Sequence, residues 1–352
     1  MKTRLIFLVL FFLLLTSCAP KSSPPTLTVM THDSFAVSED VVKAFETQNN
    51  VSLIFIKSGD TGTMLNRAVL TKDSPQADVL YGVDNTFLSR AIKEEIFEPY
   101  TSPLLVNVAN NFKENLDGMV TPINFGDVCI NYDKKYFISH NLAIPQTLND
   151  LLKSEYGSSA SGAPLLVVEN PATSSPGLAF LLATIAEFGE EGYLEFWRGL
   201  KSNGVVVVND WDTAYYTNFS ASSGKGLQPM VVSYATSPAA EVIYASSPLT
   251  ESPTASILGV NTCFRQIEYA GILKGTKNLT MAQKFIDFML DVQFQEDLPL
   301  QMFMYPVNQN ASLPSEFEKY AQAAENPAVL DPALISEKRD QWIKDWTEVM
   351  LP

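Results

Sequence analysis

The stretch GVVVVNDWDTAYYT, residues 204–217, joins a run of valines to a cluster of polar and aromatic side chains. The four valines at 205–208 predict a short strand buried on both faces. In open α/β sheets ligands bind beyond the carboxyl ends of the strands, where this cluster would emerge. Trp211 and the following tyrosines, beside Asp210 and Asp212, suit a flat organic cation held by stacking and by charge. The alternative is a surface turn whose aromatic side chains support a neighbouring helix.

The rest of the chain alternates predicted strands with predicted helices. Short apolar runs predict strands at 27–30, 51–56, 77–81, 121–132, 165–168, within 229–238 and at 265–273. Apolar spacing predicts helices at 39–48, 64–67, 87–95, 145–152, 178–188, 280–290 and 332–350. This alternation predicts an α/β fold with a parallel sheet between helices. A length of 352 residues favours two lobes over one small core.

Two loops between a predicted strand and a predicted helix expose backbone N–H groups. The first, KSGDTGT at 57–63, contains Asp60, Thr61 and Gly62. The second, ENPATSSPG at 169–177, contains Ser174 and Ser175, and we expect Ser175 to cap the next helix with a proline in its first turn. Helix N-termini of this kind bind anions. A tight turn in the first loop and plain helix capping in the second are equally good interpretations.

The composition narrows the range of partners. The formal net charge is −15 and the pI is about 4.6. Strong negative charge disfavours nucleic acid and anionic membrane as electrostatic partners, and it is compatible with a cationic ligand. The chain has only two histidines, His32 and His140, so the composition disfavours a His-rich metal site and a Ser–His–Asp triad.

The first residues are typical of a secreted lipoprotein. Lys2 and Arg4 precede an apolar run at 5–15 that is too short for an ordinary transmembrane helix. The run ends in LTSC, which resembles the lipobox in which a cysteine, here Cys18, becomes lipid-modified. We therefore expect a signal peptide at 1–17 and a lipidated, Pro-rich tether at 18–26. The body would lie outside the cytoplasm, anchored to the outer face of the cytoplasmic membrane or in the periplasm.

Two further cysteines remain, Cys129 and Cys263. Outside the cytoplasm an even number of cysteines is compatible with a disulfide. Two buried free thiols are the alternative, and the spacing alone does not decide between them.

An ordered series of short stretches resembles the thiamine-binding proteins of bacterial ABC importers, from about residue 27 to the C-terminus. The stretches are Leu27-Thr28-Val29, Asp33-Ser34-Phe35, Leu65-Asn66-Arg67, Ala77-Asp78-Val79, Gly82, Asp84-Asn85, Tyr132-Asp133-Lys134, Thr173-Ser174, Pro176-Gly177-Leu178, Trp211, Ala214-Tyr215, Ser233-Tyr234, Thr236-Ser237-Pro238, Ala282-Gln283-Lys284-Phe285, Met304-Tyr305-Pro306-Val307 and Gln341-Trp342. The resemblance implies a two-lobed, type II periplasmic-binding-protein-like α/β fold. Each lobe would be a mostly parallel sheet flanked by helices, with lobe I at 27–127 and 266–352 and lobe II at 128–265.

The resemblance also implies a ligand and its contacts. The ligand would be thiamine, thiamine monophosphate or thiamine diphosphate, with no cofactor, no metal and no catalytic residue. The implied contacts are His32, Asp33, Asp60, Thr61, Gly62, Ser174, Ser175, Trp211, Tyr215, Tyr234, Ala235, Thr236, Ser237 and Phe303. Three positions depart from the family pattern, which has Tyr at His32, Trp at Phe303 and an aromatic residue at Ala240. A precursor pyrimidine or a related cation therefore stays open as the ligand.

The family mechanism implies further expectations. The lobes would close over the ligand, and the closed form would dock as a monomer on a membrane permease driven by a separate ATPase subunit. The lobes would be linked by crossing strands, with Cys129 in the outgoing connection and Cys263 before the returning one. The resemblance thus implies a disulfide between them that braces the hinge.

Two alternatives stay open. Adjacent Tyr215 and Tyr216 are candidate phenolate ligands for ferric iron in a binding protein of the same fold. A thiaminase-like enzyme would instead use a free, reactive Cys129 with Glu241 or Glu268 as the base.

Overall fold

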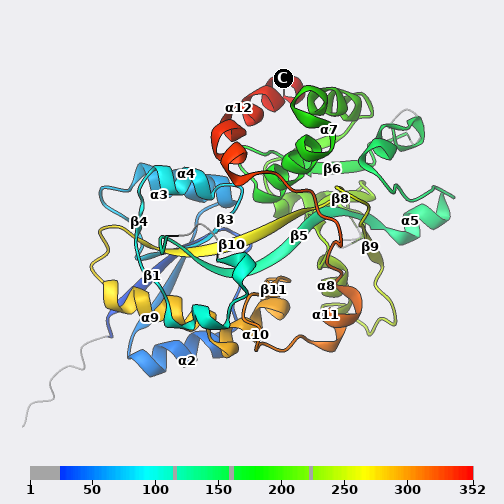
Figure 1. Ribbon diagram of the computed structural model, residues 1–352. Coiled ribbons are helices and arrows are strands. Elements are labelled where there is room, and N and C mark those ends of the chain that lie inside the picture. Colours follow the sequence, from blue (N-terminus) through cyan, green and yellow to red (C-terminus); the bar gives the residue numbers. More distant parts are fainter. Residues whose placement is uncertain (1–23, 114–116, 158–161, 222–224, 352) are drawn as a thin grey trace, which may run out of the picture.

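The computed structural model describes residues 24–113, 117–157, 162–221 and 225–351 (Figure 1). The predicted signal peptide and Cys18 lie outside these residues. The strands are β1 (Thr26–Thr31), β2 (Ser52–Lys57), β3 (Val79–Asp84), β4 (Phe97–Glu98), β5 (Thr121–Asp133), β6 (Leu166–Glu169), β7 (Val206–Val208), β8 (Met230–Tyr234), β9 (Thr254–Ile257), β10 (Phe264–Leu273) and β11 (Tyr305–Pro306).

Helices separate most of these strands. The α-helices are α2 (Glu39–Asn49), α3 (Thr61–Leu70), α4 (Leu88–Lys93), α5 (Lys134–Ser139), α7 (Ser175–Ser202), α8 (Ser237–Ile243), α9 (Leu279–Leu290), α10 (Val292–Gln301), α11 (Ser315–Tyr320) and α12 (Pro332–Met350). Short 3-10 helices are η2 (Pro103–Asn107), η3 (Asn110–Phe112), η4 (Leu148–Leu152) and η5 (Ser154–Tyr156), and η6 (Thr213–Asn218) is a π-helix. None of the helices in the described ranges is long and apolar enough to cross a membrane.

One mixed sheet runs through the molecule in the order β2-β1-β3-β10-β5-β8-β6-β7. Strands are parallel at both ends, where β2, β1 and β3 form one group and β8, β6 and β7 the other. The long strands β5 and β10 pair antiparallel in the middle and join the two groups (Figure 1). We call the two ends of the sheet, with their helices, the β1 side and the β6 side. The chain thus has the α/β architecture expected from its alternating pattern.

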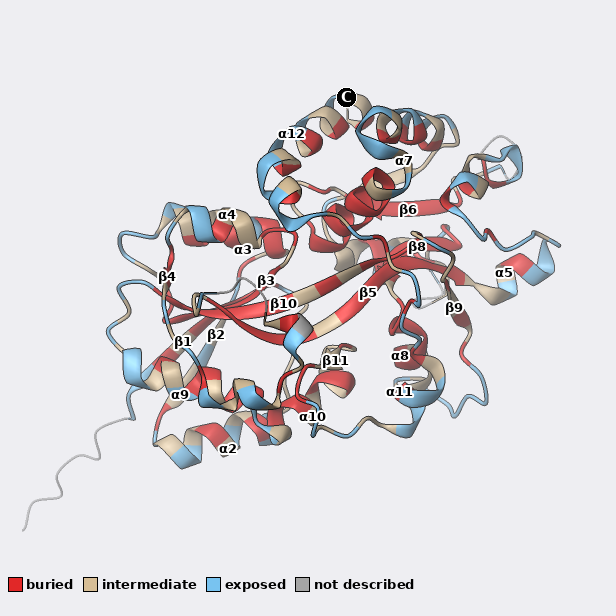
Figure 2. Ribbon diagram, viewed as in Figure 1, coloured by how far each residue is buried: buried red, intermediate tan, exposed pale blue. Residues whose placement is uncertain are grey.

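Apolar residues are buried on both sides of this sheet (Figure 2). On the β1 side, Phe45 of α2 packs against Phe285 of α9, with ring centroids 5.1 Å apart. On the β6 side, Trp197 of α7 meets Trp346 of α12 edge to face, with centroids 5.4 Å apart. These aromatic pairs pack neighbouring helices against each other on each side of the molecule.

The C-terminal helices pack away from the lobe to which the expected domain division assigns them. That division places 266–352 in lobe I, yet α12 lies beside α7, and Phe317 of α11 packs on Ala239 of α8 (Figure 1). Both contacts are on the β6 side. The apolar spacing of α12 identifies a helix, but it does not say which surface covers its buried stripe.

Some local predictions are wrong in detail. Strand β7 is half-buried, because it is the edge strand of the sheet. The N-cap of α7 is Ser174, one residue before the predicted Ser175. That helix is longer than predicted and is interrupted at Gly189, whose φ is 72°. The helix predicted at 145–152 is the short 3-10 helix η4, with Thr147 in a capping box.

Candidate functional site

A cavity of about 900 Å³ opens between the β1 side and the β6 side, at the carboxyl ends of several strands. It is lined by ten of the fourteen predicted contacts, namely His32, Asp33, Asp60, Thr61, Ser175, Trp211, Tyr215, Tyr234, Ser237 and Phe303. Gly62, Ser174, Ala235 and Thr236 do not line it. The structure therefore brings the strand-end residues together around one space.

Aromatic rings form one wall of the cavity. The π-helix η6 places Tyr215 parallel to Trp211, with centroids 5.0 Å apart and an interplanar angle of 18°. Tyr216 and Tyr234 meet Trp211 edge to face, at 5.5 and 6.3 Å. The surface-turn interpretation of this stretch is wrong, because these rings line a cavity.

Hydrogen bonds hold this wall in place. The Trp211 indole Nε1–H donates to Ser233 Oγ at 2.9 Å, and that hydroxyl lies 3.0 Å from Ser237 Oγ. Tyr234 donates to Gln266 at 3.1 Å, and Tyr215 donates to the Glu241 carboxylate at 2.6 Å. Since these polar atoms have protein partners, the ring faces are what the wall offers to a ligand.

The start of α3 lies on the β1 side of the cavity. Asp60 caps the helix by accepting from the Thr61 N–H at 2.8 Å, and Thr61 Oγ1 donates to the Gly82 carbonyl at 3.1 Å. Burial raises the pKa of the Asp60 carboxyl, opposed by the nearby Ser174 hydroxyl and the Thr61 N–H. The Gly62 N–H donates across to Thr173 O at 3.0 Å, so Gly62 connects the two sides without lining the cavity.

The start of α7 faces α3 from the β6 side. The hydroxyls of Ser174 and Ser175 are buried; that of Ser174 lies near the Asp60 carboxyl, whereas that of Ser175 has no hydrogen-bond partner among the described residues. Only Ser175 lines the cavity. Thr236, which precedes α8, likewise has a buried hydroxyl without a described partner, whereas Ala235 lies beside the two cysteines. The α7 start can hold an anion or a hydroxyl group.

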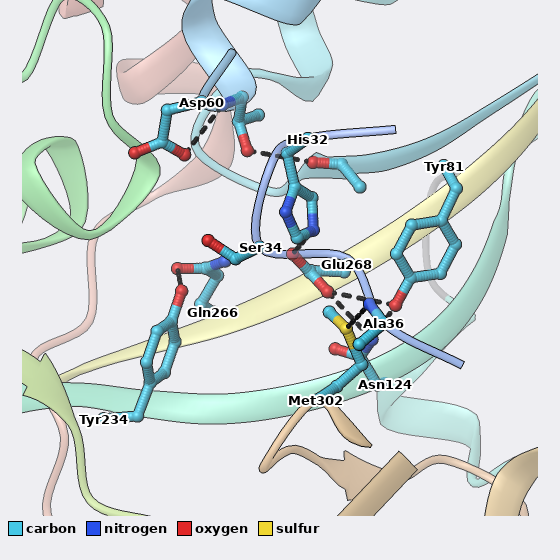
Figure 3. A network of polar contacts seen from close by, with 12 residues as sticks. His32, Ser34, Ala36, Asp60, Tyr81, Asn124, Tyr234, Gln266, Glu268 and Met302 are labelled. Carbon is cyan, nitrogen blue, oxygen red and sulfur yellow. Dashed lines mark hydrogen bonds and ion pairs between the residues drawn. The ribbon is translucent and has the colours of Figure 1, made fainter. Parts of the chain in front are cut away.

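A buried polar network reaches the cavity wall at His32 and Glu268 (Figure 3). His32 Nε2 is 3.2 Å from Glu268 Oε1, and Glu268 accepts hydrogen bonds from Tyr81 at 3.2 Å and from Asn124 at 2.8 Å. Asn124 also contacts the Tyr81 hydroxyl. His32 follows β1 while Glu268 lies on β10, so no local sequence signal joins them.

The cavity lining is rich in acidic groups. Among the described lining residues, Asp33, Asp60, Asp212, Glu241 and Glu268 contribute carboxyl groups, against one ammonium, that of Lys57, and the imidazole of His32. Such a lining suits a ligand that carries positive charge. Lys57, Ser34 and Met302 also line the cavity and were absent from the predicted contacts, although Lys57 opens the loop at 57–63 and Ser34 lies in the resembling stretch at 33–35.

The two cysteines are joined in a disulfide, with their Cα atoms 4.4 Å apart. Cys129 lies on β5 and Cys263 directly precedes β10, and both are fully buried away from the cavity. The thiaminase-like alternative is therefore wrong in its nucleophile, because Cys129 has no free thiol.

For the iron alternative, the rings of Tyr215 and Tyr216 are adjacent, with centroids 5.4 Å apart, and the Tyr215 hydroxyl is hydrogen-bonded to Glu241. Within the described ranges no group of three His, Cys, Asp or Glu side chains is placed to hold a metal ion.

Comparisons with known proteins agree with this architecture. The chain is 32% identical over 345 residues to the thiamine-binding periplasmic protein of Escherichia coli K12, covering 95% of this chain and 96% of that protein. It is 29% identical to the protein of the same name from Brucella suis, with 97% and 98% coverage. A solved periplasmic thiamin binding protein superposes with a TM-score of 0.81 at 29% identity, covering 94% of this chain and 97% of that one.

A more distant structure shares the fold alone. Iron-bound HitA from Pseudomonas aeruginosa superposes with a TM-score of 0.72 at 20% identity, covering 93% of this chain and all of that one (100%). The fold is that of type II periplasmic binding proteins. The family model described as bacterial extracellular solute-binding protein matches residues 74–325. The chain therefore belongs to the bacterial extracellular solute-binding protein family.

Proposed function

We propose that this protein captures thiamine or a thiamine phosphate outside the cytoplasm and delivers it to an ABC importer. The observation that carries the proposal is the wall of Trp211, Tyr215 and Tyr234 in a cavity whose lining is rich in carboxyl groups. Thiamine combines two flat rings with a permanent positive charge, which that combination suits. The names of the relatives point to the same ligand.

The cavity suggests an orientation for the ligand. Its rings would lie against Trp211 and Tyr234, with Asp60 or Asp212 offsetting the positive charge. The hydroxyethyl end, or a phosphate, would meet the N-termini of α3 and α7, where the Ser175 hydroxyl has no described partner. Thr236 and Ala235 do not line the cavity and would support the aromatic wall from behind without touching the ligand.

Contacts across the cavity support closure over the ligand. Ser34 Oγ donates to Asp212 Oδ1 at 3.0 Å, and the Trp211 N–H approaches Asp60 Oδ2 at 3.4 Å. Each contact joins the β1 side to the β6 side, as expected for two lobes that close by a hinge motion through β5 and β10. The closed form would dock as a monomer on a permease with its ATPase subunit. We assign binding and no catalysis.

Calorimetric titration of the purified protein tests the ligand. We expect submicromolar binding of thiamine, its monophosphate or its diphosphate, with the ligand recovered intact, and no heat with ferric citrate. The absence of a binding signal with every thiamine form would overturn the proposal. Binding of ferric citrate with a purple colour would favour the iron alternative. Recovery of cleaved thiamine would show catalysis.

The proposed membrane attachment has its own test. We propose that Cys18 carries the lipid that anchors the protein, with residues 1–17 removed. Mass spectrometry of the N-terminal peptide should find Cys18 as the first residue, with an acylated mass. An unmodified Cys18, or a chain that still begins at Met1, would contradict the anchor and leave the ligand assignment untouched.

A further inference from the structure

His32 is a buried titratable side chain on the wall of the ligand cavity. It is 5% exposed, and its Nε2 faces the Glu268 carboxylate at 3.2 Å. In Figure 3 its ring lies between Asp60 and Glu268. A change in the charge of this ring would therefore change its electrostatic interaction with a ligand in the cavity, at short range and with little screening by solvent.

The backbone fixes the position of the ring. Gly82 has a φ of +97°, and a Cβ at this position would stand 2.2 Å from His32 Cδ2. The Gly82 carbonyl accepts from the Thr61 hydroxyl at the start of α3. Because only glycine leaves space for the imidazole there, the ring is held against Glu268 and has little freedom to move away from a ligand.

The groups around His32 are mostly acidic. Glu268 on β10 is its ion-pair partner, and Asp60 and Asp212 add negative charge from the N-cap of α3 and from the segment after β7. Tyr81 on β3 donates its hydroxyl to Glu268. Lys57, which also lines the cavity, donates to the Asp33 carbonyl at 2.7 Å.

These surroundings set the protonation of the pair. Burial lowers the pKa of His32, but the charge and hydrogen bond of Glu268, with Asp60 and Asp212, outweigh it, so the pKa is raised overall. For Glu268, burial raises the pKa, and the His32 charge with hydrogen bonds from His32, Asn124 and Tyr81 brings it below its ordinary value. Without a ligand, His32 therefore holds its proton to higher pH than an exposed histidine does.

We propose that His32 determines which ligand charge the cavity accepts, because a cation binds only as His32 gives up its proton. The inference rests on the proposed function. The imidazolium loses the Nδ1 proton to solvent and keeps Nε2–H directed at Glu268. Glu268 stays ionised and becomes the counter-charge of the ligand. A phosphate near His32 has the opposite effect, because it favours the imidazolium.

This linkage has a definite direction. Below the pKa of His32 in the free protein, thiamine affinity should fall by up to about tenfold per pH unit, because one proton must leave for each cation bound. Above that pKa the affinity should level off. The affinity of thiamine relative to thiamine diphosphate should therefore rise with pH.

Proton counting by calorimetry tests the inference. Thiamine is titrated at one pH in two buffers of different protonation enthalpy, with His32→Asn and His140→Asn as variants. His140 is exposed at the end of α5, stacked on Tyr136, and is the only other histidine. We expect the wild type and His140→Asn to release the same fraction of a proton, and His32→Asn to release less.

Imidazole NMR of the wild type provides a second measurement that does not depend on any variant folding. With two histidines the signals are separable, and we expect His32 to be protonated without ligand and neutral with thiamine bound. Equal proton release by His32→Asn and wild type, or an imidazole that stays neutral in the free protein from pH 5 to pH 8, would overturn the inference. Absence of thiamine binding at every pH would overturn the proposed function along with it.

Discussion

At the scale of single residues, Trp211 offers a large aromatic face whose orientation is fixed by its neighbours. Its indole is held by Ser233 and backed by Tyr215. A stacked ring contributes about 0.5–1.5 kcal/mol beyond its buried area. A desolvated cation over indole adds up to about 2 kcal/mol. Trp211→Ala should therefore weaken thiamine binding by about tenfold or more, measured by calorimetric titration.

The matched control for this prediction is Trp211→Phe. It retains an aromatic face and loses the hydrogen bond to Ser233, so its affinity should fall between those of the wild type and the alanine variant. If Trp211→Ala binds thiamine as tightly as the wild type does, the ring does not contact the ligand.

The buried carboxyl group of Asp84 leads to a prediction about how the stability of the folded protein depends on pH. Its Oδ1 accepts from the Thr86 N–H, the Thr86 hydroxyl and the Phe87 N–H, while its buried Oδ2 has no described partner. Burial raises the pKa of this carboxyl to about 7. The folded state therefore binds more protons than the unfolded state between about pH 4 and pH 7, so stability is lost as pH rises through that window.

Asp84→Asn should remove much of this pH dependence. The amide keeps the Oδ1 acceptor and cannot ionise, so the variant should gain stability relative to the wild type at pH 8, on the order of a few kcal/mol. Urea unfolding between pH 4.5 and pH 8 measures the difference. Exposed Asp73→Asn is the charge-matched control and should follow the wild type. Parallel profiles for Asp84→Asn and wild type would contradict the prediction.

For single residues, the sequence predicts which side chains can contact a ligand better than it predicts which side chains contact one another. Trp211, Asp60 and Ser175 can be predicted because each follows a strand and carries a group that a ligand can use. The ion pair of His32 with Glu268 cannot, because 236 positions separate the partners and only the β1–β3–β10 pairing brings them together.

The bounds and burial of helices and strands were likewise predictable in some cases and not in others. The helix predicted at 332–350 is α12 with the same bounds, because its amphipathic spacing is long and uninterrupted. The burial of β7 was not predictable, since four valines fit a central strand as well as an edge strand. The cap of α7 was misplaced by one residue because Ser174 and Ser175 are both suitable caps.

The start of α3 provides a prediction about closure. A Cβ on Gly62 would stand 2.7 Å from Ala172 O and 2.9 Å from Thr173 O, which belong to the β6 side. Gly62→Ala should therefore hinder closure and weaken thiamine binding about tenfold or more. In an open form this contact would be absent, and alanine favours a helix by up to about 1 kcal/mol. The ligand-free stability should thus be unchanged or slightly higher.

Calorimetry and small-angle X-ray scattering with and without thiamine measure these effects. Gly177→Ala is the matched control, because its Cβ would stand 2.5 Å from Glu169 O within the β6 side. That variant should lose stability whether thiamine is present or not. A Gly62→Ala protein that binds and compacts like the wild type would show that α3 and the 172–173 turn do not approach on closure.

At the scale of the whole molecule, the two long strands decide how the parts assemble. Strands β5 and β10 pair with each other and connect the β1 side with the β6 side, so distant segments share one sheet. The two-lobed fold was predictable from the ordered resemblance along the chain. The packing of α11 and α12 on the β6 side was not, because a buried helical stripe does not identify its partner surface.

The disulfide constrains this connection, because Cys129 lies on β5 and Cys263 directly before β10. Its removal frees a loop of 134 residues in the unfolded chain. Cys129→Ala/Cys263→Ala should therefore lower the free energy of unfolding by about 2–5 kcal/mol, measured by urea denaturation against the oxidised wild type.

Thiamine affinity serves as the internal control for the double alanine variant. Neither cysteine lines the cavity, so the folded variant should bind thiamine as the wild type does. The single variant Cys263→Ala should be as unstable as the double variant, because either substitution breaks the same bond. Unfolding free energies equal to that of the wild type would show that the bond does not restrain the chain. A loss of affinity with unchanged stability would mean instead that the pair positions the ligand, through the neighbouring Ala235.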